Sequence, residues 1–122
     1  GDRAISTVAG CIQDIIGQRG ISARIGGEEF AVFPKEVSLP AGLRIANELR
    51  ESVESIFFRA NPRNVIPLRV SVGVSWSSSG AGFETLMAEA DEQLYNAKRS
   101  GRNRVCAKTE DARNEIRMAI NR

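Results

Sequence analysis

Histidine is absent from the 122 residues of this chain. A chain without histidine has no Ser-His-Asp or Cys-His catalytic centre, no histidine general base and no His-containing zinc site. Cysteine is scarce, because Cys11 and Cys106 are the only two and they form no CxxC pair. A disulfide scaffold is therefore not expected, and we predict a reducing, cytoplasmic setting in which both cysteines are packing residues.

Long hydrophobic runs and a strong charge of one sign are also lacking. No apolar stretch approaches the ~20 residues that a membrane span needs, and no signal peptide opens the chain. The 17 Lys and Arg residues nearly balance 15 Asp and Glu residues, for a net charge of +2. Bulk charge therefore does not hold this protein on nucleic acid or on an anionic membrane. With 42% hydrophobic and 26% charged residues, the composition is typical of one ordinary globular domain.

Apolar periodicity predicts alternating helices and strands. Helices are expected over residues 2–17, 40–58, from about residue 86 to near Gly101, and over 109–122; strands are expected over 21–25, 30–33, 68–76 and 104–107. This order predicts an α+β fold with an antiparallel-containing central sheet flanked by helices, and a ferredoxin-like layout stays open. The sheet needs one more strand, because no strand precedes the first helix.

The chain divides into one domain over residues 1–108 and a C-terminal helical extension over residues 109–122. Thr109 is the expected N-cap of this last helix. Its apolar face is expected to contain Ala112, Ile116, Ala119 and Ile120. The helix either packs back on the domain, which is the favoured alternative, or begins a linker, or extends a dimer contact.

Two adjacent carboxylates are the first candidates for chemistry. Glu28 and Glu29 follow Gly26 and Gly27 at the tip of the hairpin predicted for residues 21–33. Glycine lets a ligand approach the backbone closely, and Mg²⁺ prefers carboxylate oxygens together with substrate phosphates. A nucleoside triphosphate with its metal fits this combination. The alternative is a turn that simply faces solvent, and these four residues alone do not exclude it.

The second candidate is a basic run near the end of the third helix. It reads Lys98-Arg99-Ser100-Gly101-Arg102-Asn103-Arg104 and contains four cations and no acid. Lys98 and Arg102 flank a glycine turn that would point both at one phosphate group. Alternatively, the charges only stabilise the helix C-terminus. The Ser/Gly loop at 77–82 does not match GxxxxGK[ST], which excludes an ordinary Walker-A NTPase.

Three segments carry a resemblance to a known family. They read Arg24-Ile25-Gly26-Gly27-Glu28-Glu29-Phe30, Val70-Ser71-Val72-Gly73-Val74, and Ala90-Asp91-Glu92-Gln93-Leu94-Tyr95-Asn96-Ala97-Lys98-Arg99-Ser100-Gly101-Arg102-Asn103-Arg104-Val105. In this order and spacing, over residues 1 to about 107, they strongly resemble the GGDEF family, the diguanylate cyclase domains of bacterial signalling proteins. The resemblance implies a GGDEF fold related to the nucleotidyl cyclases and polymerase palm domains.

The resemblance also implies a reaction. Two such domains face each other as a homodimer, each holding one GTP with Mg²⁺ or Mn²⁺. The 3′-hydroxyl of each GTP attacks the α-phosphate of the other, two pyrophosphates leave, and cyclic di-GMP forms. Phosphoryl transfer asks the protein mainly for positioning and charge neutralisation, so a histidine-free chain suits it.

The matching positions imply the catalytic residues. Glu28 is the expected metal ligand and helps to deprotonate the attacking hydroxyl, and Glu29 is the second catalytic acid of the signature. Gly26 and Gly27 are expected to let the hairpin pass close to the nucleotide.

Three further positions imply contacts to the substrate. Lys98 and Arg102 are expected to bind the triphosphate. Asp2 is expected to read the guanine edge, in addition to any capping of the first helix.

Two departures from the family pattern lead to further expectations. Family members begin with a strand that supplies a second metal carboxylate, a phosphate-binding lysine and a guanine-binding asparagine, whereas this sequence opens after it with Gly1. We therefore expect a GGDEF fold that lacks its first strand, with half a metal site and impaired turnover. Gly17 and Gly20 stand where many members carry the Arg and Asp of an RxxD motif that binds product, so no inhibitory product site is expected.

Two other functions stay open beside the enzyme. One is a catalytically inactive GGDEF module that regulates, binds GTP or mediates an interaction; the intact Gly26–Phe30 signature favours the enzyme over it. The other is a nucleic-acid-binding ferredoxin-like module that uses the basic run 98–104. The net charge of +2 and the lack of an aromatic platform make it the weakest of the three.

Overall fold

The computed structural model describes residues 2–35, 38–61, 63–77, 82–107 and 115–121 of the chain. The elements are α1 (Asp2–Ile16), the 3-10 turn η1 (Gly17–Arg19), β1 (Gly20–Arg24), β2 (Glu29–Pro34), α2 (Leu39–Glu54), β3 (Phe57–Asn61), β4 (Asn64–Pro67), β5 (Ser71–Ser77), α3 (Phe83–Arg99), β6 (Val105–Ala107) and β7 (Glu115–Asn121). This mixture of helices and strands confirms the α+β class.

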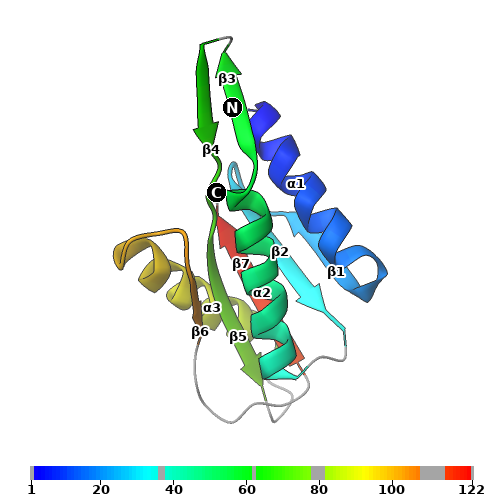
Figure 1. Ribbon diagram of the computed structural model, residues 1–122. Coiled ribbons are helices and arrows are strands. Elements are labelled where there is room, and N and C mark those ends of the chain that lie inside the picture. The colour runs from blue at the N-terminus through cyan, green and yellow to red at the C-terminus, as the bar shows by residue number, and fades with distance from the viewer. Residues whose placement is uncertain (1, 36–37, 62, 78–81, 108–114, 122) are drawn as a thin grey trace.

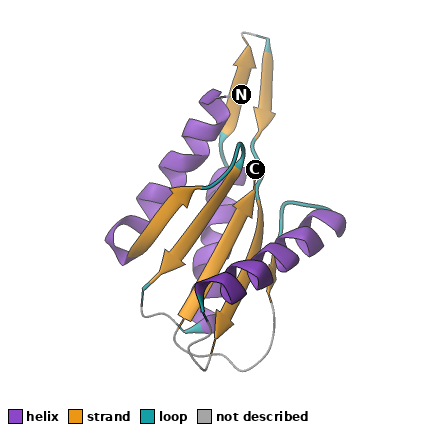
Figure 2. Ribbon diagram, turned by 180° about the vertical axis from the view of Figure 1, so that it is seen from behind, coloured by secondary structure: helices purple, strands orange, loops and turns teal. Residues whose placement is uncertain are grey.

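A five-stranded sheet forms the middle layer, in the order β1-β2-β7-β5-β6. β5 and β6 are parallel, and the other neighbouring pairs are antiparallel. α1 and α2 cover one face of the sheet and α3 covers the other (Figures 1 and 2). β3 and β4 form a separate two-stranded ribbon that projects from one end of the molecule. The expected central sheet flanked by helices is therefore confirmed.

The main core lies between this sheet and the pair α1 and α2. In α1 the apolar side chains recur at helical spacing, and Val8, Ile12 and Ile16 are each at most 2% exposed. They join Leu49 of α2 and Val72 of β5 in one buried cluster. The apolar stripe predicted for the first helix is confirmed, and it fixes α1 against the sheet.

β5 is buried on both faces, which the sequence pattern did not predict. Its expected polar face includes Gly73 and Ser75, yet Ser75 is fully buried because α3 packs against it. The Ser75 Oγ donates to the Leu86 carbonyl oxygen at 2.6 Å. A Cβ on Gly73 would lie 2.8 Å from the backbone carbon of Gln93, so this close helix-to-strand packing requires glycine. The alternation along β5 thus separates two buried faces, not a core face from solvent.

The second helix is shorter than predicted. α2 begins after the N-cap Ser38, whose Oγ accepts from the Ala41 amide at 3.2 Å. It ends at Glu54 instead of residue 58, and the Ser55 Oγ donates to the Ser52 carbonyl oxygen at 2.8 Å. The residues from Phe57 onward form β3, which pairs with β4. Adjacent aromatic residues favour strands over helices, so this part of the helix prediction is wrong.

The helix predicted for residues 109–122 is wrong over residues 115–121, which form β7. Its proposed N-cap Thr109 and apolar residue Ala112 lie outside the described residues. β7 pairs with β2 on one side and with β5 on the other, at the centre of the sheet. Two open strand edges outweigh the weak helical periodicity of a short segment, because each edge supplies a full row of backbone partners. The central position, expected to lack a strand because the family's first strand is absent from this sequence, is instead occupied by β7.

Among the described helices, none combines the length and the apolar character that crossing a bilayer would take.

Candidate functional site

The turn that joins β1 to β2 carries Glu28 at one end of the sheet. The Ile25 amide donates to the Glu29 carbonyl oxygen at 2.9 Å and closes the turn. β1 and β2 pair in register from Gly20 opposite Pro34 to Arg24 opposite Phe30, which confirms the predicted hairpin. The turn itself is exposed, so its side chains face solvent at the sheet end.

Two side chains hold this turn by its carbonyl oxygens. Arg24 Nη2 donates to the Gly27 oxygen at 2.6 Å and Arg24 Nε to the Gly26 oxygen at 3.1 Å. From the other side, Asn121 Nδ2 at the end of β7 donates to the Glu28 oxygen at 3.1 Å. These hydrogen bonds fix the backbone of the turn from both sides, and the turn therefore holds Glu28 in a defined position at the end of the sheet.

A second turn follows α3 and carries Arg102. The Arg102 amide donates to the Ala97 carbonyl oxygen at 2.9 Å, which ends the helix. Three consecutive residues then have positive φ, namely Gly101 at 130°, Arg102 at 61° and Asn103 at 45°. Positive φ is uncommon for residues other than glycine, and such strain clusters at functional sites. The chain rejoins the sheet where the Val72 amide donates to the Arg104 oxygen at 2.9 Å.

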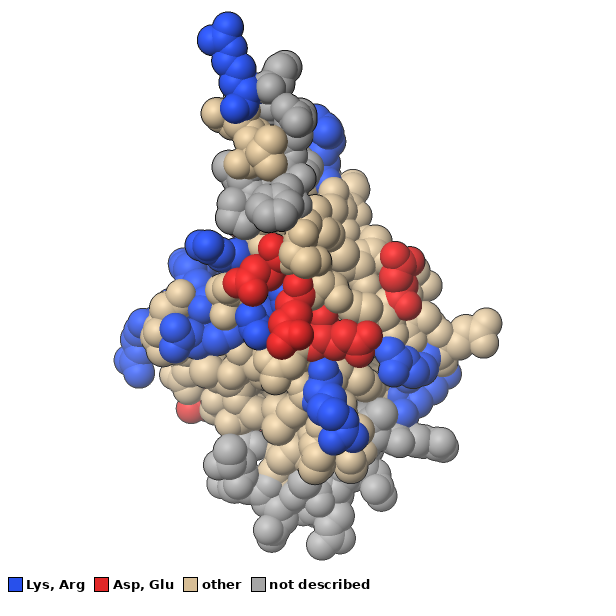
Figure 3. Space-filling model, viewed as in Figure 1, with Lys and Arg blue, Asp and Glu red and all other residues tan. Residues whose placement is uncertain are grey.

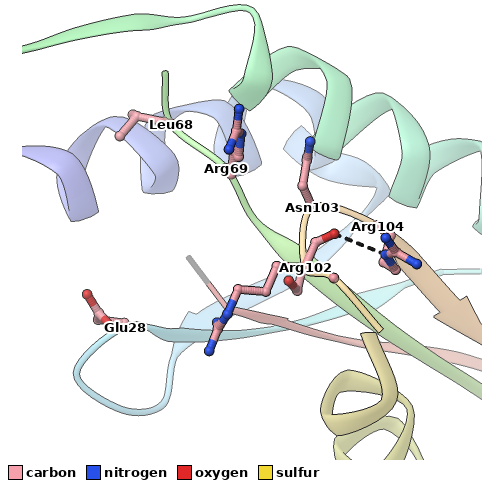
Figure 4. A pocket seen from close by; sticks show the side chains of 8 residues that line it. Glu28, Leu68, Arg69, Arg102, Asn103 and Arg104 are labelled. Carbon is pink, nitrogen blue, oxygen red and sulfur yellow. Dashed lines mark hydrogen bonds between the residues drawn. The ribbon is translucent and has the colours of Figure 1, made fainter. Parts of the chain in front are cut away.

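These two turns meet across one cavity of about 560 Å³. Its described lining consists of Glu28, Leu68, Arg69, Ser71, Gly101, Arg102, Asn103 and Arg104. Figure 4 shows Arg102 reaching from its turn toward the side of the cavity that carries Glu28. Segments more than seventy residues apart in the sequence therefore line one pocket.

The charges of the pocket fit an anionic ligand that carries a cation. Arg69, Arg102 and Arg104 line it together with one described acid, Glu28. Among the described residues, the Arg102 guanidinium has no hydrogen-bond or ion-pair partner, whereas Arg104 Nε donates to the Arg102 carbonyl oxygen at 3.1 Å. An arginine with unused donors beside a carboxylate is suited to phosphate oxygens and their counter-ion.

The structure brings together some of the predicted site residues and not others. Glu28 and Arg102 line the same pocket, and Gly26 and Gly27 precede Glu28 in its turn. Lys98 lies in the last turn of α3 and is not among the described lining residues.

Two further predicted residues lie near the turns but outside this lining. Glu29 begins β2, is half-buried and stands opposite Asn121 of β7. Asp2 begins α1, and the placement of its side chain lies outside what the structure describes.

Arg69 and Asn103 belong to the pocket but did not emerge as candidates from the sequence. Arg69 is the one exposed residue in the stretch from Leu68 to Trp76, and that isolated cation was the available signal. Asn103 donates through Nδ2 to Glu54 Oε2 of α2, and its Oδ1 is buried without a partner among the described residues. The contact joins residues that are 49 positions apart in the sequence, so no local sequence pattern predicts it.

A divalent metal is implied by the family resemblance, and the protein supplies part of a donor set that a bound triphosphate would complete. Glu28 offers an exposed carboxylate at the pocket, and Glu29 follows it at the start of β2. Within the described part of the chain, no group of three acidic, cysteine or histidine side chains converges on one point. Mg²⁺ commonly binds one or two carboxylates and completes its shell with substrate phosphates and water, so Glu28 with a bound triphosphate suffices as a donor set.

The turn expected to lack a product site contains Gly17, with φ of 50°, and Gly20. A Cβ on Gly20 would lie 2.5 Å from the Phe33 carbonyl oxygen, because Gly20 pairs closely with Pro34. An aspartate at this position therefore conflicts with the present β1–β2 pairing. A separate cavity of about 600 Å³ lies beside this turn, lined by Gln18, Arg19, Lys35, Ala41, Arg44, Ile45 and Glu48.

Comparison with known proteins gives a consistent result. Residues 1–104 match the family model described as diguanylate cyclase, GGDEF domain. The chain is 41% identical over 110 residues to the probable diguanylate cyclase DgcF of Escherichia coli K12, covering 86% of this chain and 35% of DgcF. It is 42% identical over 91 residues to the response regulator PleD of Caulobacter vibrioides, covering 72% of this chain and 20% of PleD. The chain thus spans about a third or less of the length of these relatives.

Solved structures give the same fold. The GGDEF domain of DgcB from Caulobacter crescentus, solved in complex with c-di-GMP, superposes with a TM-score of 0.80 at 35% identity, over 88% of this chain and 64% of that chain. A structure described as the active GGEEF domain of a diguanylate cyclase from Vibrio cholerae gives 0.77 at 26% identity, over 91% of this chain and 70% of that one. The protein belongs to the GGDEF family of diguanylate cyclase domains.

Proposed function

We propose that this domain condenses two molecules of GTP into cyclic di-GMP and releases two pyrophosphates. The pocket that joins Glu28 to Arg69, Arg102 and Arg104 is the observation that carries the proposal. Three guanidinium groups supply the charge that a triphosphate needs, and the carboxylate supplies the place for its metal. The names of the similar proteins support this reaction over other phosphoryl transfers.

Of the proposed substrate-binding residues, Arg102 lines the described pocket, and the others are assigned from the family resemblance. Arg102 binds the triphosphate oxygens, and Lys98 contributes from the end of α3. Gly26 and Gly27 let the nucleotide lie against the backbone of the turn. Asp2 reads the guanine edge from the start of α1.

Glu28 is the proposed ligand of Mg²⁺ or Mn²⁺, with Glu29 as the second acid. A divalent metal held there would neutralise phosphate charge and make the α-phosphorus a better electrophile. Glu28 accepts, directly or through water, the proton that leaves the attacking 3′-hydroxyl. The new bond joins that oxygen to the α-phosphorus of the other GTP, and the bond to the bridging oxygen of pyrophosphate breaks.

We expect turnover by this chain alone to be weak. Glu28 is the one acid among the described residues that line the pocket, and phosphoryl transfer loses charge stabilisation when a metal has few protein ligands. The same observation favours the second candidate function, a GGDEF module that binds GTP with little or no turnover.

Incubation with GTP and Mg²⁺ tests both functions. Formation of cyclic di-GMP and pyrophosphate that disappears in Glu28→Gln supports the cyclase. GTP binding that is weakened by Arg102→Ala, without any product, supports the GTP-binding module. If GTP neither binds nor reacts, the assignment of this pocket is wrong.

Four further properties belong to the same proposal. The domain acts as a homodimer in a bacterial signalling protein. Its catalytic unit includes β7 (Glu115–Asn121) in addition to the expected residues 1–108, because β7 pairs with both β2 and β5. Cyclic di-GMP does not inhibit it through the turn from Gly17 to Gly20, so titration with product should leave the initial rate unchanged. A reducing, cytoplasmic setting is supported by two free cysteines, Cys11 and Cys106.

A further inference from the structure

The strained turn of Arg102 is attached to the distant helix α2 by one side-chain contact. Asn103 donates through Nδ2 to Glu54 Oε2, near the C-terminal end of α2. Backbone hydrogen bonds join this turn to the neighbouring α3 and β5, and the Arg104 Nε donates to the Arg102 carbonyl oxygen within the turn itself. The hydrogen bond to Glu54 therefore links the side chains of this turn directly to the opposite layer of the molecule.

The chemistry of Glu54 fixes the orientation of the Asn103 amide. An ionised carboxylate only accepts hydrogen bonds, so Nδ2 must face it and Oδ1 must point away. The Oδ1 atom is buried without a partner among the described residues. Losing the carboxylate would remove the interaction that selects this orientation and would leave Asn103 free to turn.

Asn103 and Arg102 are neighbours whose side chains point in opposite directions. Figure 4 shows Asn103 directed toward α2 and Arg102 directed into the pocket, on the side of Glu28. Both residues have left-handed backbone conformations, which persist only where surrounding contacts enforce them. Holding Asn103 on one side therefore holds the Cα–Cβ direction of Arg102 on the other.

The surface charges agree with this arrangement. Figure 3 shows acidic side chains gathered over α2, directly beside a group of basic side chains. Arg50 Nη1 lies 3.7 Å from Glu54 Oε1, so the carboxylate forms an ion pair within its own helix and accepts a hydrogen bond from the turn of Arg102. The ion pair with Arg50 is partly exposed and contributes little by itself.

We propose that Glu54 is a positioning residue for the phosphate contact of Arg102 and that it acts through Asn103. Glu54 does not touch the nucleotide in this proposal, which rests on the proposed function of Arg102. The contact sets where the guanidinium stands before substrate arrives, so its loss weakens binding of the triphosphate and not of the nucleoside.

The test measures the dissociation constants of a non-hydrolysable GTP analogue and of guanosine by calorimetry, with Mg²⁺ present. Glu54→Ala should raise the dissociation constant of the GTP analogue by about three- to tenfold, the range expected for loss of one charge-assisted contact that acts indirectly. Guanosine should bind unchanged. Glu54→Gln keeps an oxygen acceptor for Asn103 and should stay within about twofold of the original chain.

Two further variants separate positioning from general effects. Glu51→Ala removes the same charge from the same helix. Because Glu51 is exposed and lies 3.5 Å from Arg50 and not from the turn of Arg102, this variant should bind the GTP analogue normally. Asn103→Gly keeps the positive φ while deleting the amide, so it should reproduce the effect of Glu54→Ala. The two changes combined should be no worse than either alone, because they remove one contact.

Arg102→Ala is the reference for the proposed function. The positioning role of Glu54 is refuted if Arg102→Ala weakens binding of the GTP analogue while Glu54→Ala does not. It is also refuted if Glu54→Ala weakens binding of guanosine equally. In both cases the phosphate role of Arg102 stands. If Arg102→Ala leaves triphosphate binding unchanged, the phosphate role itself fails, and the role of Glu54 fails with it.

Discussion

Gly27 stands in a turn where the packing of the chain does not require glycine. Its φ is not in the left-handed region, and a Cβ would meet no atom of the protein within 4 Å. A methyl group at this position therefore costs the fold almost nothing. Any requirement for glycine comes from a ligand that lies against the turn.

Gly27→Ala should leave the midpoint of thermal unfolding within about 2 °C of the original chain. It should weaken GTP binding by about tenfold or more, because the methyl displaces a nucleotide that packs on the backbone. Thermal melting and calorimetric titration measure the two effects. Gly10→Ala in α1 is the control, because a Cβ at Gly10 would also meet no atom within 4 Å. It should neither change the affinity for GTP nor lower the midpoint of thermal unfolding. Unchanged GTP affinity in Gly27→Ala would remove the proposed role of this glycine.

Cys11 allows a prediction about pH at the residue scale. Burial raises the pKa of its thiol, and the Asp14 carboxylate one turn later raises it further. Both causes act against the thiolate, so less of it is present at a given pH than in an unfolded chain, and the folded state loses stability as the pH rises through this raised pKa.

In a Cys106→Ser background, alkylation of Cys11 by iodoacetamide should therefore be slower in the folded than in the unfolded chain at pH 8. Asp14→Asn removes one of the two causes, so the midpoint of the pH–rate profile should move to lower pH. Asp91→Asn on α3 is the matched control and should leave the midpoint in place. A midpoint that does not respond to Asp14→Asn would mean that burial alone sets this pKa.

At the residue scale, the sequence predicted the charged residues of the pocket better than the long-range contacts that hold them. Glu28 and Arg102 could be named because each belongs to a short local pattern that contains the chemistry itself. The contact between Asn103 and Glu54 could not, because it forms only when α2 and the turn after α3 meet in three dimensions. Arg69 was not predicted for a related reason. A single cation next to a strand belongs to no sequence motif, and it becomes a candidate only because the fold places it in the pocket.

At the element scale, β7 decides whether the sheet is one layer or two halves. It lies between β2 and β5, which do not pair with each other. Met118 and Ile120 are fully buried in the same core cluster as α1 and α2. Their spacing of two residues fits a strand, but the segment is too short for its period to exclude a helix. The sequence predicted a missing central strand and assigned it to the absent first strand of the family. It did not predict that residues 115–121 occupy this position, because that depends on open strand edges elsewhere in the fold.

Ile120→Ala should lower the free energy of unfolding by about 2–5 kcal/mol, the cost of removing a fully buried isoleucine side chain. Urea denaturation measures this. Ile21→Ala is the matched control, because Ile21 lies on β1 with 64% of its surface exposed. It should cost less than about 1 kcal/mol. Equal and small losses in both variants would mean that residues 115–121 are not part of the central sheet.

At the scale of the whole molecule, the described pocket contains one acid and three arginines, whereas the proposed reaction needs two triphosphates. Each GTP must supply an attacking hydroxyl and also a leaving pyrophosphate. A pocket of about 560 Å³ that is open at one end of the sheet accommodates one nucleotide against Glu28 and Arg102. In the proposed reaction a second copy of the chain presents the second nucleotide, so we expect the rate to depend on association.

Mixing the chain with Glu28→Gln tests this dependence. In a mixed pair only one pocket retains its carboxylate, so only one of the two phosphodiester bonds forms readily. Adding an excess of Glu28→Gln to a fixed amount of the original chain should lower the yield of cyclic di-GMP and cause a linear dinucleotide with one remaining triphosphate to accumulate, together with one pyrophosphate. Chromatography of the reaction mixture separates these products. Doubly substituted Glu28→Gln, Arg102→Ala chain is the control, because it binds nucleotide poorly and should yield less of the linear product. A rate that is indifferent to added Glu28→Gln would mean that one chain completes both bonds alone.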